Sequence, residues 1–208
     1  MASTRQHHHL LEDLEVKSLL TRERYYRDSS QWAKLRTSYH PDASRTLIKV
    51  SWFEGDADSF VTQSQKMASS GTVARHLFTP VEVHFSKDRK RAVSESTGNI
   101  TIRVKLGGDG RAYEMTSWAR FVSRLEKLGD EWKMLGLEPI YERDTITPVT
   151  PGGDTRSLGT FTKGGRESYA CLAWVLGLRG YETDMELAGT DRPETVDRLM
   201  KSHFEWLE

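Results

Sequence analysis

The chain has 208 residues, and its 30 Lys and Arg residues balance 30 Asp and Glu residues without clustering, which argues against a nucleic-acid partner. A single cysteine, Cys171, excludes an internal disulfide and indicates a reducing compartment, so we expect a cytoplasmic protein. No uncharged apolar run approaches the ~20 residues that span a bilayer, and the N-terminal residues are too polar for a secretory signal, so no membrane partner is expected.

Residues 10–41 are predicted to form a helical hairpin. Apolar residues recur every three or four positions from Leu10 to Leu20, which predicts an amphipathic helix that runs to about Tyr26. Residues 28–30, Asp-Ser-Ser, suit the N-cap of a second helix that ends at Pro41. The adjacent histidines at 7–9 cannot all converge on one metal ion, so residues 1–13 are treated as a tail without a metal site.

A strand, a third helix and then a sheet follow. Residues 45–53 are β-branched and aromatic enough for a strand, and the segment Gly-Asp-Ala-Asp that begins at Gly55 predicts the cap of a helix reaching Gly71. From residue 74 to 143 the apolar pattern changes to period two, and segments of turn composition interrupt it. We therefore predict four antiparallel strands.

The alternation within these strands predicts a cavity. Even positions from Ala92 to Leu106 and odd positions from Tyr113 to Leu125 are small or apolar, and so point inward. The inward sets include serines at 94, 96, 117 and 123. Because a buried hydroxyl needs a hydrogen-bond partner, a cavity with polar groups explains these serines better than a plain hydrophobic core does.

The last predicted strand raises a question about Glu138. Strict alternation places Glu138 on the same face as Trp132 and Met134. If this face lines the cavity, burial raises the pKa of the Glu138 carboxyl, as a general acid or base near neutral pH requires. If the strand is turned the other way, Glu138 lies on the surface while Leu135 and Leu137 pack inside.

The C-terminal residues, 144–208, are predicted to form a linker and a helical extension. Residues 145–165 are rich in Thr, Pro and Gly, as linkers are. Residues 166–178 are apolar on nearly all sides, and residues 193–207 form an amphipathic pattern that begins with Pro193. These two helices either close the cavity or pack against a second subunit.

Three segments carry a resemblance to a known family. The sequences YYRDSSQWAKLRTSYHPDA, ARHLFTPVEVHFSKDRKRAVSES and GDEWKMLGLEPI resemble those of SnoaL-like polyketide cyclases and scytalone dehydratase, in the nuclear transport factor two-like superfamily. The resemblance covers roughly residues 14–143. It implies an α+β fold, in which a cone-shaped, curved antiparallel sheet is wrapped by N-terminal helices.

The resemblance also implies positions for an active site. Asp28, four residues before Trp32, is similar in position to the family's active-site aspartate, and His76 matches the histidine that opens the next strand. The tyrosine that precedes the family's aspartate is replaced by Arg27, with Tyr26 one position earlier.

Two further positions depart from the dehydratase pattern. Its second histidine falls near Ser96 and its asparagine near Phe121, so dehydration of scytalone itself is not expected. We expect His76 to act as general base or acid, Asp28 to orient it or relay a proton, and Glu138 to be a second candidate for the base. The residues expected to contact substrate are Tyr26, Trp52 and Phe121 as walls and Ser96 as a hydrogen-bond partner.

The implied activity needs no metal or organic cofactor. It is an isomerisation, cyclisation or dehydration of a carbonyl-containing polycyclic, polyketide-type or terpenoid-type small molecule by acid/base catalysis. Two alternatives stay open, a non-catalytic small-molecule binder and a dimerisation module of the same fold. In those readings Asp28 only caps a helix, and His76 is a structural residue. We also expect a homodimer.

Overall fold

The computed structural model describes residues 4–106, 110–150 and 165–208, with side chains from His9 onward. In chain order the elements are α1 (Thr4–Asp28), α2 (Trp32–Thr37), the 3₁₀ helix η1 (Ala43–Arg45), β1 (Leu47–Val50), β2 (Phe53–Gly55), α3 (Ala57–Ser69), β3 (Ala74–Phe85), β4 (Arg91–Leu106), β5 (Arg111–Leu128), β6 (Glu131–Pro148), α4 (Ala170–Gly177) and α5 (Pro193–Leu207).

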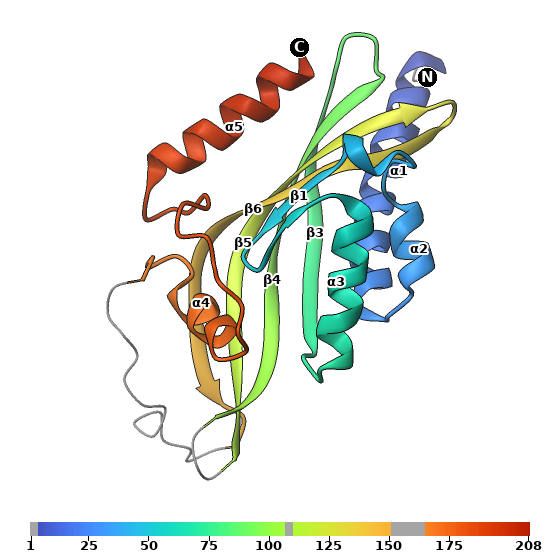
Figure 1. The fold of residues 1–208 in the computed structure, drawn as a ribbon. Coiled ribbons are helices and arrows are strands. Elements are labelled where there is room, and N and C mark those ends of the chain that lie inside the picture. The colour runs from blue at the N-terminus through green and yellow to red at the C-terminus, as the bar shows by residue number, and fades with distance from the viewer. Residues whose placement is uncertain (1–3, 107–109, 151–164) are drawn as a thin grey trace.

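The strands form a curved sheet in the order β2-β1-β6-β5-β4-β3. Neighbouring strands are antiparallel except β1 and β6, which are parallel. Helices α1, α2 and α3 lie on one side of the sheet, here called the inner face, and α5 lies on the other side, the outer face (Figure 1). This arrangement confirms the predicted α+β fold with a curved, mainly antiparallel sheet and N-terminal helices.

The inner face carries the main hydrophobic core, as the alternation of apolar residues predicts. Every odd-numbered residue from Tyr113 to Leu125 is buried there, with at most 2% of its surface exposed. The apolar residues among them join one cluster with Leu20 of α1 and with Phe60 and Met67 of α3. Helix α3 begins as predicted, because its N-cap residue Asp56 accepts a hydrogen bond from the N–H of residue 59.

The outer face is covered by α5 of the same chain. Val93, Val122 and Ile140 lie on three neighbouring strands, are fully buried, and form a second cluster with Leu207 of α5. The apolar residues of α5 recur at helical spacing, so one side of this helix packs on the sheet. Val122 therefore does not offer an outward surface for another chain.

Some element ends differ from the sequence prediction. Helix α1 begins at Thr4, inside the segment treated as a tail, and continues to Asp28. The predicted cap at residues 28–30 was wrong, because α2 has Gln31 at its N-cap and no side-chain capping bond. The predicted strand at 45–53 is a hairpin, in which β1 and β2 flank a turn at Ser51 and Trp52.

Two β-bulges change which side chains point inward. In β3 the pairing shifts between Pro80 and Glu82. Even-numbered residues such as His76 point inward before this bulge, and the odd-numbered Val83 and Phe85 point inward after it. Between β5 and β6 the pairing shifts at Leu135, because Leu125 pairs with Met134 while Arg124 pairs with Gly136. Each inserted residue reverses the alternation beyond it.

Helix α4 lies over β5 and β6, on the part of the sheet far from the free ends of α1 and α5 (Figure 1). Leu172 and Leu176 are each 1% exposed and belong to the inner core cluster. Asp144 of β6 accepts a 2.8 Å hydrogen bond from the Leu172 N–H and so holds the start of the helix. Strand β6 extends to Pro148, so it includes the first residues of the predicted linker, most of which lies outside the described residues.

Candidate active site

Asp28 and His76 form a hydrogen-bonded pair where the end of α1 meets the start of β3. Asp28 Oδ1 lies 2.7 Å from His76 Nδ1, and Asp28 Oδ2 accepts a 2.6 Å hydrogen bond from the His76 backbone N–H. Because an ionised carboxylate only accepts, Nδ1 carries the ring proton and Nε2 keeps its lone pair. The structure thus brings together the two residues that the family resemblance singled out.

The end of α1 is fixed on β3 by a further contact. Arg75 Nη1 donates a 2.6 Å hydrogen bond to the backbone carbonyl of Asp28. Asp28 is the last residue of α1, so its carboxylate reaches past the helix end to the first residues of the strand. Three hydrogen bonds therefore define the position of the Asp28–His76 pair, and two of them involve backbone atoms.

His76 borders a cavity between the inner face of the sheet and helices α1, α3 and α4. About 490 Å³ of space between atoms lies here, including space that opens to solvent, and about 30 Å³ of it is accessible to the centre of a water molecule. Most of its walls are apolar, and Trp52, Phe60 and Phe121 supply aromatic faces. The polar residues that border it are Arg24, Arg27, Ser51, His76 and Tyr141.

Arg27 contacts the unprotonated ring nitrogen of His76. Its Nη1 lies 3.4 Å from His76 Nε2, and its guanidinium carbon lies 5.6 Å from the centre of the Trp52 ring. The Arg27 Nε atom is buried without a hydrogen-bond partner among the described residues. Arg24, one helical turn earlier, is instead hydrogen-bonded to the carboxylate of Glu23.

The surroundings fix the charge states of the pair. Burial lowers the pKa of His76 to about 4, and the positive charges of Arg27 and Arg24 add to this effect although Asp28 opposes it. Burial alone raises the pKa of Asp28, but hydrogen bonds from His76 and the charge of Arg27 bring it below its ordinary value. At neutral pH the pair is therefore an ionised aspartate and a neutral histidine.

Of the four predicted substrate contacts, Trp52 and Phe121 border the cavity and Tyr26 does not. Tyr26 lies on another side of α1, against Lys34 of α2, with the Lys34 ammonium 5.6 Å from its ring centre. Successive helix residues point about 100° apart, and of these two neighbours Arg27 borders the cavity. The structure therefore does not place Tyr26 where it was predicted, in the wall of this cavity.

Ser96, the fourth predicted contact, points to the inner face but is not among the residues that border this cavity. It is 2% exposed and pairs with Phe121 on β5 and Pro80 on β3. Its hydroxyl has no partner among the described residues, whereas Ser94 donates a 2.9 Å hydrogen bond to the Glu82 carbonyl. Ser96 is therefore part of the core beside the cavity.

Glu138 lies on the outer face, which is the second of the two orientations that the sequence left open, so strict alternation from Trp132 was wrong and Glu138 is not a candidate base in the cavity. The bulge at Leu135 turns Leu137 inward and Glu138 outward, where it pairs with Val122. There it lies 3.0 Å from Nε2 of His203, a histidine of α5 that is 1% exposed. Burial raises its pKa, but His203 and Arg124 outweigh burial and lower it.

Sequence reasoning missed Arg24, Arg27 and Tyr141 as cavity residues. Arg24 and Arg27 lie four and seven residues after Leu20, so they are on the apolar side of α1. Charged residues on the buried side of a helix indicate a polar site, and this signal could have identified them. Tyr141 accepts a 3.0 Å hydrogen bond from the Ser51 N–H, which links β6 to the turn after β1. The bulge at Leu135 that turns Glu138 outward also turns Tyr141 inward, so simple alternation from Trp132 misplaces it.

Residues 8–138 match the sequence pattern of the SnoaL-like domain. The chain belongs to the SnoaL-like family. Along 95% of its length, this SnoaL-like protein is 27% identical to Pea pathogenicity protein 2 of Fusarium vanettenii, of which the match covers 86%. The relative's name describes a role in disease and gives no reaction.

Solved structures share the fold of this SnoaL-like protein. A protein assigned as a scytalone dehydratase from Novosphingobium aromaticivorans has a TM-score of 0.54 at 13% identity, covering 71% of this chain and 97% of the other. A type 2 hexachlorocyclohexane dehydrochlorinase has a TM-score of 0.53 at 12% identity, covering 71% and 96%. At these identities the likeness establishes the fold alone. No helix in the described parts of this SnoaL-like chain is long and apolar enough to cross a membrane.

Proposed function

We propose that this protein is a cofactor-independent acid/base enzyme that moves a proton on a carbon next to a carbonyl group of a small molecule. The observation that carries the proposal is the buried Asp28–His76 pair, in which the unprotonated Nε2 contacts Arg27 and belongs to a residue that borders an apolar cavity. A neutral imidazole fixed by a carboxylate is an arrangement that serves general base catalysis.

The proposed step starts with His76 Nε2 taking the proton from the carbon. The C–H electron pair becomes part of an enolate, and the imidazole becomes an imidazolium that Asp28 stabilises. In an isomerisation, the imidazolium returns the proton to another carbon of the enolate. In a dehydration, it gives the proton to a β-hydroxyl group, which leaves as water while a carbon–carbon double bond forms. Both routes restore neutral His76.

The cavity walls favour a flat, mainly apolar substrate. Trp52 and Phe60 stack with ring centres 5.8 Å apart, and Phe121 packs against Phe78 at 5.0 Å. These faces suit a ring system of the polyketide or terpenoid kind. Two proteins of the same fold are named for the removal of water or hydrogen chloride, which supports a proton-transfer reaction by analogy of fold only.

The test is an activity assay on β-hydroxy ketones that carry a phenyl or naphthyl group, some with and some without a carboxylate. Loss of water gives a conjugated ketone, which absorption spectroscopy detects. We expect His76→Ala and Asp28→Asn to lower kcat/KM by about 10²- to 10⁴-fold while the proteins stay folded.

His84→Ala is the matched control, because His84 lies on the same strand but pairs with Glu95 on the outer face. It is expected to keep the wild-type rate. A His76→Ala protein with the wild-type rate would exclude the proposed base. A wild-type protein that binds these ketones without converting any of them would favour the non-catalytic binding module.

A further inference from the structure

We propose that the cavity selects substrates carrying a carboxylate, which Arg27 binds beside His76, and that such substrates enter along a basic groove. This proposal rests on the proposed function, because a ligand of the cavity is a substrate only if the protein is an enzyme. Anion binding by Arg27 is, however, measurable without any reaction.

The first observation is that the positive charge of Arg27 is only partly offset. The nearest carboxylate oxygen, Asp28 Oδ1, lies 4.0 Å from Nη1 and already contacts the ring of His76, while Oδ2 binds the His76 N–H. Arg24, by contrast, has its own carboxylate in Glu23, which also accepts a 2.8 Å hydrogen bond from Tyr39.

The hydrogen-bond donors of Arg27 are also incompletely used. Its side chain is 8% exposed, Nε has no partner among the described residues, and Nη1 makes a long 3.4 Å contact with His76. A buried guanidinium with spare donors is costly unless an anion satisfies it. A planar carboxylate matches the guanidinium fork, and the neighbouring Trp52 and Phe60 faces match a flat ring attached to it.

The second observation is a basic groove that leads to this end of the cavity. Arg75, Arg103, Lys105 and Arg179 line it, and among the described residues the one carboxylate that lines it is that of Glu114. Glu114 pairs with Arg103 at 3.0 Å, so within the described lining the other three cations are in excess. In a chain with no net charge, this local excess of positive charge attracts anions.

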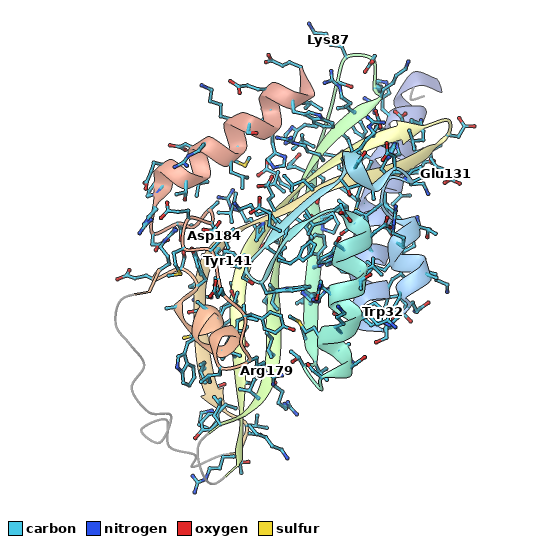
Figure 2. The ribbon with its side chains drawn as sticks, viewed as in Figure 1. Trp32, Lys87, Glu131, Tyr141, Arg179 and Asp184 are labelled. Atoms are coloured by element: carbon cyan, nitrogen blue, oxygen red, sulfur yellow. The ribbon has the colours of Figure 1, made fainter. Side chains whose placement is uncertain are left out.

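Another pocket lies between the groove and the cavity. That pocket shares Val73 and Arg75 with the groove and shares Arg27, Met67 and Ala74 with the cavity. Arg179 closes one side of this route, because its guanidinium donates a hydrogen bond to Thr72 at the end of α3. Figure 2 shows Arg179 at the end of α4 and Tyr141 further along the sheet. A continuous set of basic side chains therefore runs from the surface to His76.

A bound carboxylate would also change the base. The charged groups around the His76 ring are Arg24, Arg27 and Asp28, all from α1, and the two arginines help to keep its pKa low. An anion on Arg27 offsets one of these positive charges and raises the affinity of Nε2 for a proton. Binding the correct substrate would thus make His76 a stronger base.

The experiment uses the whole chain with benzoate and, as its neutral counterpart, benzamide. Binding is measured by isothermal titration calorimetry, and the His76 ring is followed by NMR over a pH series. We expect benzoate to bind at least about tenfold more tightly than benzamide, and Arg27→Met to remove this preference. Bound benzoate is expected to move the His76 titration to higher pH. Inorganic phosphate is a second probe and is expected to bind more weakly than benzoate.

Arg22→Met is the matched control, because Arg22 is on α1 but lies outside the cavity. It is expected to keep the wild-type preference. Equal affinity of the wild-type protein for benzoate and benzamide would overturn the inference without any variant. Benzoate binding that survives Arg27→Met, leaves the His76 titration unmoved or is exceeded by phosphate would overturn it as well.

The two proposals fail in different ways. If His76→Ala abolishes turnover but benzoate shows no preference over benzamide, the catalytic proposal stands and the anion site does not. If benzoate binds through Arg27 but His76→Ala leaves turnover unchanged, the cavity is an anion site and His76 is not the base.

Discussion

A single histidine sets the chemistry available to this cavity. His76 has a side chain that is only 5% exposed, and its Nδ1 proton is directed to Asp28. Burial beside two arginines keeps the ring neutral, and the carboxylate keeps it oriented. The same neutral ring makes stability depend on pH.

The pKa of His76 predicts how stability changes with acidity. It lies at about 4 in the folded protein, below the ordinary value of 6.5. Between these values the unfolded chain binds more protons than the folded chain, so the free energy of unfolding falls as the pH falls from about 6.5 to about 4. Urea unfolding at a series of pH values measures how steeply the free energy of unfolding depends on pH. His76→Gln is expected to reduce this dependence, and the control His84→Gln is expected to leave it unchanged. Equal slopes in His76→Gln and the wild type would show that His76 does not cause the change.

Single residues also show how far the sequence predicted the site. The quoted motifs identified Asp28 and His76, because both occupy positions that the family resemblance marks. Arg27 was visible only as a departure from the family's tyrosine, and its function depends on what surrounds it in space. Tyr26 and Arg27 are neighbours in sequence, but helix geometry sends only one of them into the cavity.

At the scale of elements, β-bulges decided which predictions failed. Period-two alternation correctly assigned the inner faces of β4 and β5, where pairing continues without interruption from Arg91 to Leu106. In β6 an inserted residue at Leu135 moved Glu138 to the outer face. A bulge of one residue leaves little trace in composition, so alternation beyond it cannot be read from sequence alone.

The packing of α5 on the sheet leads to a stability prediction. Ile140 is fully buried between β6 and α5, so Ile140→Ala leaves a cavity there and is expected to lower the free energy of unfolding by about 2–5 kcal/mol. Leu77 on the edge strand β3 is 68% exposed, and Leu77→Ala is expected to change the free energy of unfolding by less than about 0.5 kcal/mol. Urea denaturation compares the two. Similar losses for both variants would contradict the packing of α5 on the outer face.

At the scale of the whole molecule, the two C-terminal helices pack on opposite faces of the chain's own sheet. Helix α4 contributes Leu172 and Leu176 to the cavity wall, and α5 covers the outer face. The pattern of apolar residues predicted that α4 and α5 are buried. It did not predict which surface each helix packs on, because the pattern of one helix carries no information about its partner. A homodimer stays a prediction. Static light scattering tests it, because a dimer has twice the chain mass of 23.8 kDa.

The central claim is that proton transfer at carbon takes place at His76. The most direct measurement is deuterium incorporation from D₂O into the carbon beside the carbonyl of a carboxylated β-hydroxy ketone, followed by mass spectrometry. We predict that the wild-type protein and His84→Ala accelerate this exchange and that His76→Ala lowers the rate by at least about 100-fold. Exchange at the wild-type rate in the folded His76→Ala protein would contradict the claim.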